Sequence, residues 1–285
     1  MGLRISGILK QYMNERSAQS VRQLAAALEQ SGLAAGATVA LHRYRLHAVA
    51  CDVPLLMIPL SGTKRFHAGG RTWECAAGQF LMTHFAMQAD IENIPDDVAP
   101  YRAWAIPFPW EAVSMARGLL AGAVQKQGEA VSVGELPEVM DALLACIGDG
   151  DTTDTALRNY RLLGILLALF RAGHGLFLLA HDPSLSARIR LAVSADPAYE
   201  WTSANFEETF CISGATLRRR LAAEGASLRA LIQEARLHSA LMQLQVTRKP
   251  LKAVAQDHGY RSVASFRRNF AERFGIDPAE VANSR

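Results

Sequence analysis

The residues best placed for chemistry in this chain are arginines that share short helical segments with small residues near the C-terminal end. The segment SGATLRRRLAAEG, residues 213–225, begins with a serine and ends with a glycine, which favour the first and last positions of a helix. Leu217 and Leu221 lie four residues apart and mark its buried side. The other side and its flanks then carry Gly214, Ala215, Thr216, Arg218, Arg219 and Arg220. Small residues let a helix approach a DNA groove closely, and arginine beside them can reach guanine edges or phosphates.

A second segment, HGYRSVASFRRNFAERFGIDP at residues 258–278, repeats this combination. Phe266, Phe270 and Phe274 form a single stripe that fixes a helix to its own domain. The outward side and the start of this helix carry Arg261, Ser262, Ala264, Ser265 and Arg268. Ala255 and Gly259 precede it at the small-residue and turn-glycine spacing of a helix-turn-helix. We therefore predict two helix-turn-helix units that contact DNA through these outward residues.

Residues 227–245 connect the two units and are apolar on two sides. One side holds Leu228, Leu231, Ile232, Ala235 and Met242, and the other holds Leu237, Leu241 and Leu244. A helix of this length spans about 28 Å at roughly 1.5 Å per residue. Successive major grooves on one side of DNA repeat about every 34 Å, so one chain can place a unit in each. An exposed helical bundle would explain the apolar sides, but not why small residues and arginines share an outward face twice.

The charge of the chain is unevenly distributed. Residues 183–285 hold 15 Lys and Arg against 10 Asp and Glu, whereas residues 1–182 hold 15 against 17. A basic surplus attracts polyanions, because each cation that meets a phosphate releases condensed counterions. Surplus arginine is also common on a solvated face, so charge alone does not establish the partner.

The rest of the chain reads as α+β. We expect a helix within residues 5–30, then short strands over 37–108 with a hairpin turn at residues 68–70, typical of a sandwich or small barrel. Helices follow at 110–124, 136–148 and 153–173, the last capped by Thr152 or Thr153. That last helix is apolar around much of its circumference, which fits a plain core helix or a dimer contact equally well. The expected division is a first domain at 1–172, a linker at 173–184 and the helical domain at 185–285.

An enzyme has little support in these residues. A metal-dependent active site needs imidazoles and a carboxylate that converge on one ion. The available side chains are scattered and include no His-x-His pair: His42, His47, His67, Glu74 and His84. There is no GxSxG segment and no phosphate- or dinucleotide-binding fingerprint. We expect no catalytic residue, no metal and no cofactor.

Further features of the sequence concern the compartment of the protein, its cysteines and a possible small ligand. The longest apolar run, LLGILLALF, is far shorter than the roughly 20 residues that a bilayer requires, and no secretory leader is evident, so we expect a cytoplasmic protein without a membrane partner. The four cysteines are widely spaced and are expected to be reduced. If a small organic effector binds, the mouth of the β domain is the expected place. There, Arg43, Arg45 and Lys64 could hold an anionic group or could be exposed strand residues.

Residues 185–285 resemble the DNA-binding domain of the AraC/XylS family of bacterial transcription regulators. The matching residues are Trp201, the run SGATLRRRLAAEGASLRALI, Arg236, Leu237, Ala240, Ala255, Gly259, Tyr260, Phe266, Arg268, Phe270, Phe274, Gly275 and Pro278. Glu207 and Ala271 depart from the usual alanine and lysine. Within the β segment, Gly62, Lys64, Gly70, Gly78 and Tyr101 are similar to the cupin-like arm found in part of the family.

The resemblance implies a cupin-like β-barrel with dimerisation helices, followed by an all-α domain with two helix-turn-helix motifs. It implies a sequence-specific regulator, more often an activator, that binds double-stranded DNA as a homodimer, acts on RNA polymerase and can respond to a small effector. It also implies that Arg218 and Arg219 read bases, whereas Arg268 more often meets the DNA backbone. A ligand-dependent repressor and a regulator controlled by a protein partner remain alternatives.

Overall fold

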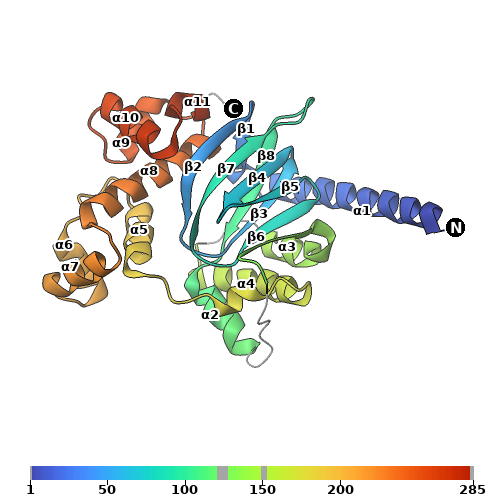
Figure 1. The fold of residues 1–285 in the computed structure, drawn as a ribbon, viewed down its shortest axis with the longest axis horizontal. Helices are drawn as coiled ribbons and strands as arrows, with labels where there is room; N and C mark the ends of the chain where they lie inside the picture. The colour runs from blue at the N-terminus through green and yellow to red at the C-terminus, as the bar shows by residue number, and fades with distance from the viewer. Residues whose placement is uncertain (1, 121–127, 149–152, 283–285) are drawn as a thin grey trace.

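The protein combines a β-rich N-terminal part with an all-helical C-terminal part (Figure 1). The computed structural model describes residues 2–120, 128–148 and 153–282, and of residues 2–13 it describes the backbone alone. The predicted α+β class is therefore confirmed. No helix in the described ranges is long and apolar enough to cross a membrane.

Two antiparallel sheets form the N-terminal part. The first has the order β1 (Thr38–Ala40), β8 (Tyr101–Pro107), β3 (Leu55–Ser61), β6 (Gln79–Thr83), β9 (Val131–Glu135). The second has the order β2 (Tyr44–Cys51), β7 (Met87–Ile94), β4 (Thr63–Ala68), β5 (Arg71–Ala76). Among the described strands none of one sheet pairs with a strand of the other, so the expected closed barrel is wrong and the domain is a sandwich.

Local signals placed some strands well and missed one. The predicted hairpin is present: β4 and β5 pair in register across Gly69 and Gly70, whose φ angles of 56° and 75° suit glycine. Strand β9 was not expected, and it pairs with β6 at the edge of the first sheet. The sandwich interior joins Leu46 and Phe66 of the second sheet to Leu81 of the first.

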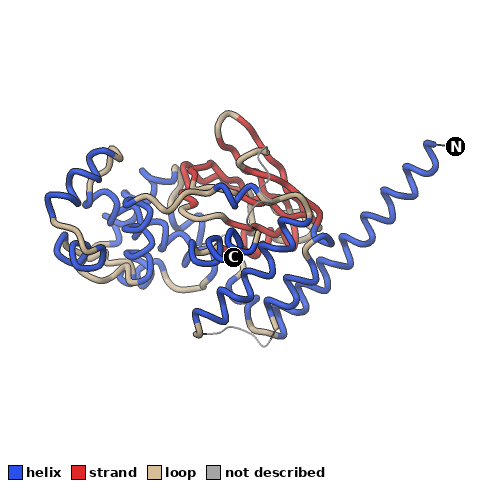
Figure 2. The backbone as a smooth tube through the Cα atoms, turned by 90° about the horizontal axis from the view of Figure 1, so that it is seen from below, coloured by secondary structure: helices blue, strands red, loops and turns tan. Residues whose placement is uncertain are grey.

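Helices cover the other face of the first sheet (Figure 2). They are α1 (Gly2–Gln30), α2 (Trp110–Leu119), α3 (Met140–Ile147) and α4 (Thr155–Arg171). In Figure 2 the first half of α1 projects beyond the body, whereas its second half packs through Leu24 and Leu28. Positions 121–124 of the helix expected at 110–124 lie outside the described residues. The cap of α4 is Asp154, which accepts the amides of Ala156 and Leu157, so Thr153 is not the cap; Thr152 also lies outside the described residues.

The segment expected as a free linker is partly packed. A short 3₁₀ helix at Leu176–Leu179 buries Leu176, Phe177 and Leu178 against the helical layer. Helix α4 ends at Arg171 and α5 begins at Leu185, so the expected boundaries fall between elements. The chain that leads to the C-terminal part is therefore anchored to the first domain.

The C-terminal part, as described up to residue 282, consists of the helices α5 (Leu185–Ala195), α6 (Ser203–Phe210), α7 (Gly214–Ala223), α8 (Leu228–Val246), α9 (Leu251–Asp257), α10 (Val263–Phe274) and α11 (Pro278–Ala282). The first half of α8 packs with α5, α6 and α7, and its second half packs with α9, α10 and α11. The prediction that α8 serves two bodies is borne out, except that Met242 is 48% exposed.

The second half of α8 also closes the open edge of the sandwich. Leu237, Leu241 and Leu244 share one apolar cluster with the sandwich interior. Gln245, only 4% exposed, donates a hydrogen bond to the hydroxyl of Tyr44 in β2 at 2.9 Å. The sheets therefore need no strand-to-strand closure at this edge, because a helix of the C-terminal part fills it.

Candidate nucleic-acid interface

The first candidate recognition helix is α7. Its N-cap is Ser213, whose hydroxyl accepts the amide of Thr216 at 3.3 Å and fixes the start of the helix. Leu217 and Leu221 are buried at 1% and 3% exposure, as predicted. Ala215 and all three arginines, Arg218, Arg219 and Arg220, are exposed, whereas Gly214 and Thr216 are half-buried. The three guanidinium groups therefore point to solvent on the side away from the core.

Glu207 lies against Gly214 at the start of α7. A Cβ at Gly214 would lie 2.6 Å from a carboxylate oxygen of Glu207, at the flexible end of that side chain. The Glu207 carboxylate thus lies beside the N-terminus of α7, where helix amides favour negative charge. This negative charge lies where a DNA phosphate could otherwise approach, and Glu207 is one of the residues that depart from the family pattern.

The second candidate recognition helix is α10. Its N-cap is Ser262, which accepts the amide of Ser265. Phe266, Phe270 and Phe274 are 0% exposed, which confirms the predicted stripe. On the outward side Arg261, Ser262, Ala264 and Arg268 are exposed and Ser265 is half-buried.

Not every arginine on α10 is available to DNA. Arg267 pairs with Asp277 at 2.8 Å at the end of its own unit. Arg261 lies 3.6 Å from Glu200 of the first unit, but both side chains are at least 90% exposed, so the pair contributes little. Within the described residues, no ion pair holds Arg268.

Arg236 of α8 ties the two units together. Its guanidinium donates to the carbonyls of Pro197 and Tyr199, at 2.8 and 2.9 Å, in the loop before α6. It also lies against Gly259 in the turn of the second unit, where φ is 75° and an added Cβ would meet the guanidinium at 3.0 Å. Arg236 therefore holds the two helix-turn-helix units at a fixed separation. Its place in the family motif pointed to this residue, whereas the spacing of residues in the sequence did not.

A charged network joins the first domain to both units, and sequence reasoning missed it. Arg190 of α5 donates bidentately to Asp52 in the turn after β2, and it lies 3.5 Å from Glu234 of α8. Arg273 of α10 pairs with the same Glu234 at 2.6 Å. All four side chains are less than 20% exposed. We call Asp52, Arg190, Glu234 and Arg273 the junction network.

His238 of α8 adds a neutral contact at the same junction. The amide of Ala50 donates to its Nε2 at 2.9 Å, so the ring proton resides on Nδ1, which faces the Glu234 carbonyl at 3.0 Å. Burial lowers the pKa of His238, which keeps the ring neutral. The residues from Ala50 to Asp52 and the helices α5, α8 and α10 thus meet at one place.

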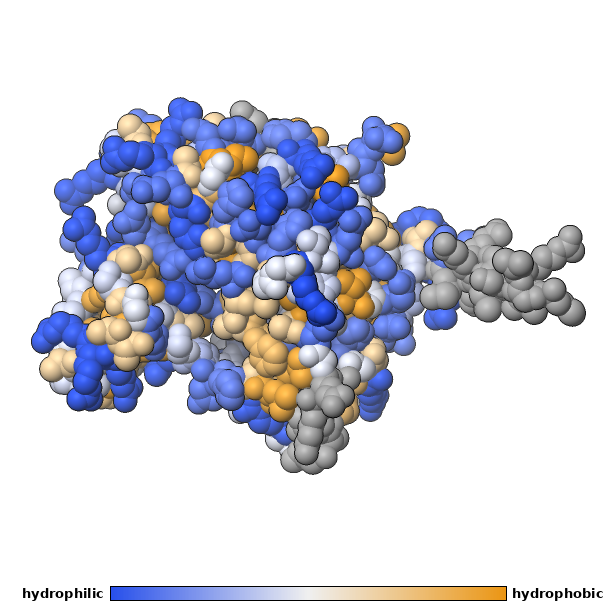
Figure 3. Space-filling view, in the orientation of Figure 1, coloured by the Kyte–Doolittle hydropathy of each residue, from blue (hydrophilic) through white to orange (hydrophobic). Residues whose placement is uncertain are grey.

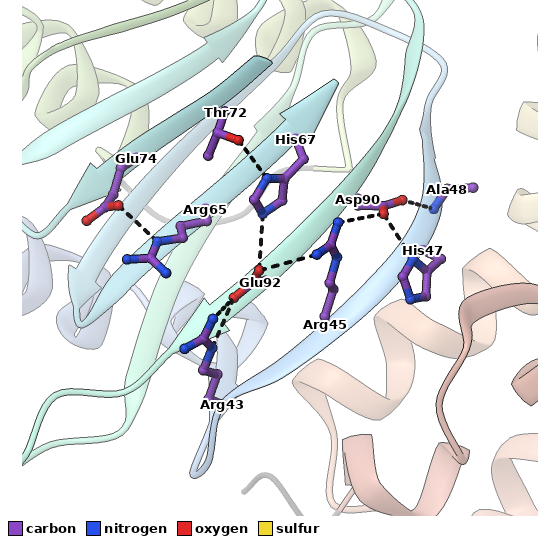
Figure 4. A network of polar contacts seen from close by, with 10 residues as sticks. All are labelled: Arg43, Arg45, His47, Ala48, Arg65, His67, Thr72, Glu74, Asp90 and Glu92. Atoms are coloured by element: carbon purple, nitrogen blue, oxygen red, sulfur yellow. Dashed lines mark hydrogen bonds and ion pairs between the residues drawn. The ribbon is translucent and has the colours of Figure 1, made fainter. Parts of the chain in front are cut away.

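The three candidate effector residues do not lie together. Arg43 and Arg45 are on the outer face of the second sheet, where their guanidinium groups meet Glu92 and Asp90 (Figure 4). The pKa of Asp90 is lowered to about 2, chiefly by the amide of Ala48 and further by His47 and Arg45. Both arginines therefore already have carboxylate partners.

Lys64 lies on the opposite face of the same sheet. It is 5% exposed and donates to Asn93 at 2.9 Å inside the sandwich. Burial lowers its pKa to about 8. The strand alternation explains the split: Lys64 shares the inner face with Phe66, whereas Arg65 faces outward to Glu74.

The candidate metal ligands stay apart as well. His47 meets Asp90, and His67 lies between Thr72 and Glu92 on the outer face (Figure 4). Glu74 pairs with Arg65, and His42 lies edge-on to Tyr44. In the part of the chain that is described, no group of three or more His, Cys, Asp or Glu is arranged to hold a metal ion.

His84 belongs to a buried polar chain that was not anticipated. Its Nε2 lies 2.9 Å from the hydroxyl of Ser132, which in turn lies 2.8 Å from Nδ1 of His174. Glu138 is 3.8 Å from the other nitrogen of His174. Burial, with a smaller contribution from His174, lowers the pKa of His84 to about 4. The chain connects the end of β6 with β9 and with the turn that follows α4.

This chain predicts acid sensitivity of folding. The pKa of His84 in the folded state, about 4, lies below its ordinary value of 6.5. The neutral ring therefore contributes its full share to the free energy of unfolding above pH 6.5, and this share is lost as the pH falls toward 4. At pH 5 we expect unfolding to require about 2 kcal/mol less than at pH 8 on account of this residue. Urea titrations of wild type and His84→Gln at both pH values measure the difference. An identical pH dependence in the two proteins would contradict the assignment.

Comparison with known proteins agrees with the C-terminal geometry. A family described as "Helix-turn-helix domain" matches residues 207–284. The regulator GadX of Escherichia coli K12 is 30% identical over 127 residues, which cover 44% of this chain and 46% of GadX. The activator AggR of Escherichia coli is 26% identical over 95 residues, 33% of this chain and 36% of AggR. The chain thus spans less than half the length of these curated relatives.

Solved structures match almost the whole fold. ToxT of Vibrio cholerae covers 87% of this chain and 97% of its own at a TM-score of 0.56 and 12% identity. A ToxT structure with a bound unsaturated fatty acid covers 87% of this chain and 94% of its own at a TM-score of 0.55 and 15% identity. At such identities the likeness concerns the fold alone.

The fold and the family match together define residues 207–284 as a helix-turn-helix domain. In its C-terminal part the chain is similar to helix-turn-helix transcription regulators. The prediction of helix-turn-helix structure in the C-terminal part is thereby confirmed.

Proposed function

We propose that this protein binds specific double-stranded DNA through α7 and α10 and activates transcription from neighbouring promoters through contact with RNA polymerase. The observation that supports this most is the pair of N-capped helices, each buried through its apolar stripe and each presenting exposed arginine beside small residues. Activation is favoured because relatives such as AggR and CsvR are named activators. Reporter expression from a bound promoter separates activation from repression.

Arg219 gives the sharpest test of base reading. Arg219→Ala is expected to weaken binding to the preferred duplex by about 1 to 3 kcal/mol and to relax its sequence preference, because an arginine in the major groove pairs with a guanine edge. Fluorescence anisotropy with the preferred and a scrambled duplex measures both effects. Arg16→Ala, an exposed arginine on α1, is the matched control and should change neither. An equal loss on every sequence would instead make Arg219 a phosphate contact.

We further propose that the contacts at the junction network hold the two units in a fixed arrangement until a small organic effector or a partner changes it. The fatty acid in the ToxT structure is a precedent for effector binding in this fold. Arg190 and Arg273 belong to different units and converge on Glu234, so a shift at Asp52 reaches both. This supports a coupling between the first domain and DNA affinity.

Dimerisation is proposed through α2 and α4. Four large apolar side chains on these helices remain exposed: Met115 42%, Leu119 65%, Leu157 39% and Tyr160 68%. Figure 3 shows apolar surface gathered over this part of the molecule. The inner side of α4 is fully packed, so its outward side is free for a second copy of the chain.

Tyr160→Glu is expected to shift the protein from dimer to monomer in sedimentation velocity, because a charge would have to be desolvated in the contact. Val98→Glu, at an apolar residue outside α2 and α4 that is 95% exposed, should leave the dimer intact. A dimer of unchanged stability in Tyr160→Glu would rule out this face.

A further inference from the structure

A cleft lies where the first domain, the connecting segment and the first helix-turn-helix unit meet. Its larger hollow measures about 580 Å³. A smaller hollow of about 260 Å³ shares Val53, Trp110, Asp182 and Pro183 with it. Volumes between about 300 and 1,000 Å³ are usual for small-molecule sites. Figure 1 shows the connection from α4 to α5 passing beside α2 on its way to this unit.

The walls of the cleft are aromatic and stiff. Trp110 and Phe210 of α6 both line it, together with Leu191 of α5, which is 42% exposed. Arg117 lies over the Trp110 ring at 4.9 Å and donates to the carbonyls of Leu178 and Ala180, which fixes this wall to the connecting segment. Such walls suit a flat aromatic ligand.

The rim carries both signs of charge. Arg188 stacks on Phe210, 4.4 Å from the ring centroid. Glu111 and Asp182 provide two exposed carboxylates. Among the described residues none of these three charges has an ion-pair partner within 4.0 Å. A ligand with one anionic and one cationic group could pair with the arginine and with the carboxylates at once. A ligand with only one charged group would pair with one side of the rim and be repelled by the other.

We propose that this cleft binds a small aromatic zwitterion, of which an aromatic amino acid is the simplest form. The ring lies between Trp110 and Phe210, the carboxylate meets Arg188, and the ammonium group meets Asp182 and Glu111. The site is separate from Arg43, Arg45 and Lys64, of which the first two are paired with carboxylates and the third is buried.

The location connects the ligand to DNA binding, and this consequence rests on the proposed function. Phe210 ends α6 and immediately precedes the turn at Cys211 that positions α7. Asp52 borders the smaller hollow and is also the carboxylate that holds Arg190. Occupation of the cleft therefore acts on the first recognition helix and on the junction network together.

Calorimetric titration of the full-length protein with four indoles tests the site. L-tryptophan carries both charges, tryptamine only the cation, indole-3-propionate only the anion, and indole neither. We expect L-tryptophan to bind best and each lost charge to weaken binding about tenfold, the scale of one charge-assisted hydrogen bond. Arg188→Ala should remove the advantage of L-tryptophan over tryptamine, whereas Arg248→Ala, an exposed arginine outside the cleft, should not.

Two outcomes would overturn the assignment: no measurable binding of any of the four compounds, or binding that Arg188→Ala leaves unchanged. DNA affinity measured in the same samples separates this inference from the proposed function. Loss of ligand binding with intact DNA binding rejects the cleft alone. Intact ligand binding without DNA binding rejects the proposed function alone.

Discussion

Phe270→Ala is expected to lower the free energy of unfolding by about 3 to 5 kcal/mol, the usual cost of removing a fully buried phenylalanine ring. The ring is 0% exposed and stands between Phe266 and Phe274, with centroid distances of 5.6 and 4.8 Å. The same apolar cluster includes Tyr44 and Leu46 of the first domain. The substitution therefore loosens the second unit from α8 and from the sandwich together.

Urea unfolding followed by tryptophan fluorescence and by circular dichroism measures this loss. Phe270→Leu, which keeps most of the volume, should cost no more than about 1.5 kcal/mol. If Phe270→Ala were as mild as Phe270→Leu, the stripe would not be packed as described.

Asp52→Ala is expected to be nearly as disruptive, at about 3 kcal/mol, because it leaves Arg190 in a partly buried place without its bidentate partner. The side chains are 15% and 17% exposed, so the cost falls at the lower end of the range for buried pairs. We also expect DNA affinity without effector to rise, because the first unit is no longer held by the turn after β2.

Urea titration and anisotropy with the preferred duplex measure the two effects of Asp52→Ala separately. The double variant Asp52→Leu, Arg190→Met removes both charges and should recover much of the stability while still releasing the unit. Unchanged stability and unchanged DNA affinity in Asp52→Ala would show that the junction network does not hold the first domain and the helix-turn-helix units together.

The C-terminal helices could be predicted because their signals are local. Ser213 caps α7 as predicted, Ser227 and Ser262 cap α8 and α10 in the same way, and the phenylalanine stripe is buried as its spacing requires. Met242 was misplaced because, although it lies on the same side of α8 as Ala235, the first unit packs only with the first half of the helix and does not cover it. The geometry of the helices alone does not identify their partner, and the prediction that this partner is DNA came from the family resemblance.

The first domain was harder because its architecture depends on distant contacts. Closure of a barrel is decided by whether β1 and β2 pair, and their sequences carry no signal that α8 fills that edge instead. Strand β9 was not predicted because it is short and contains Gly134, and glycine is uncommon in strands. One missed signal was available: the alternation in TKRFHA places Lys64 on the same face as Phe66 and away from Arg65.

The junction network had no sequence signature. Asp52 and Arg190 are 138 residues apart, and neither stands in a motif. The same holds for the chain of His84, Ser132 and His174, in which the serine lies on the unanticipated strand. Both depend on tertiary packing, which residue spacing does not encode.

Hydroxyl-radical footprinting of the full-length protein, on a duplex selected from a random pool, tests the central claim most directly. Two helix-turn-helix units joined by α8 should protect two patches on one face of the DNA, one helical turn or about 10 base pairs apart. Five base pairs inserted between the patches should abolish the second, because the rotation carries it to the opposite face. Selection of no duplex, or a single protected patch that tolerates the insertion, would contradict the account.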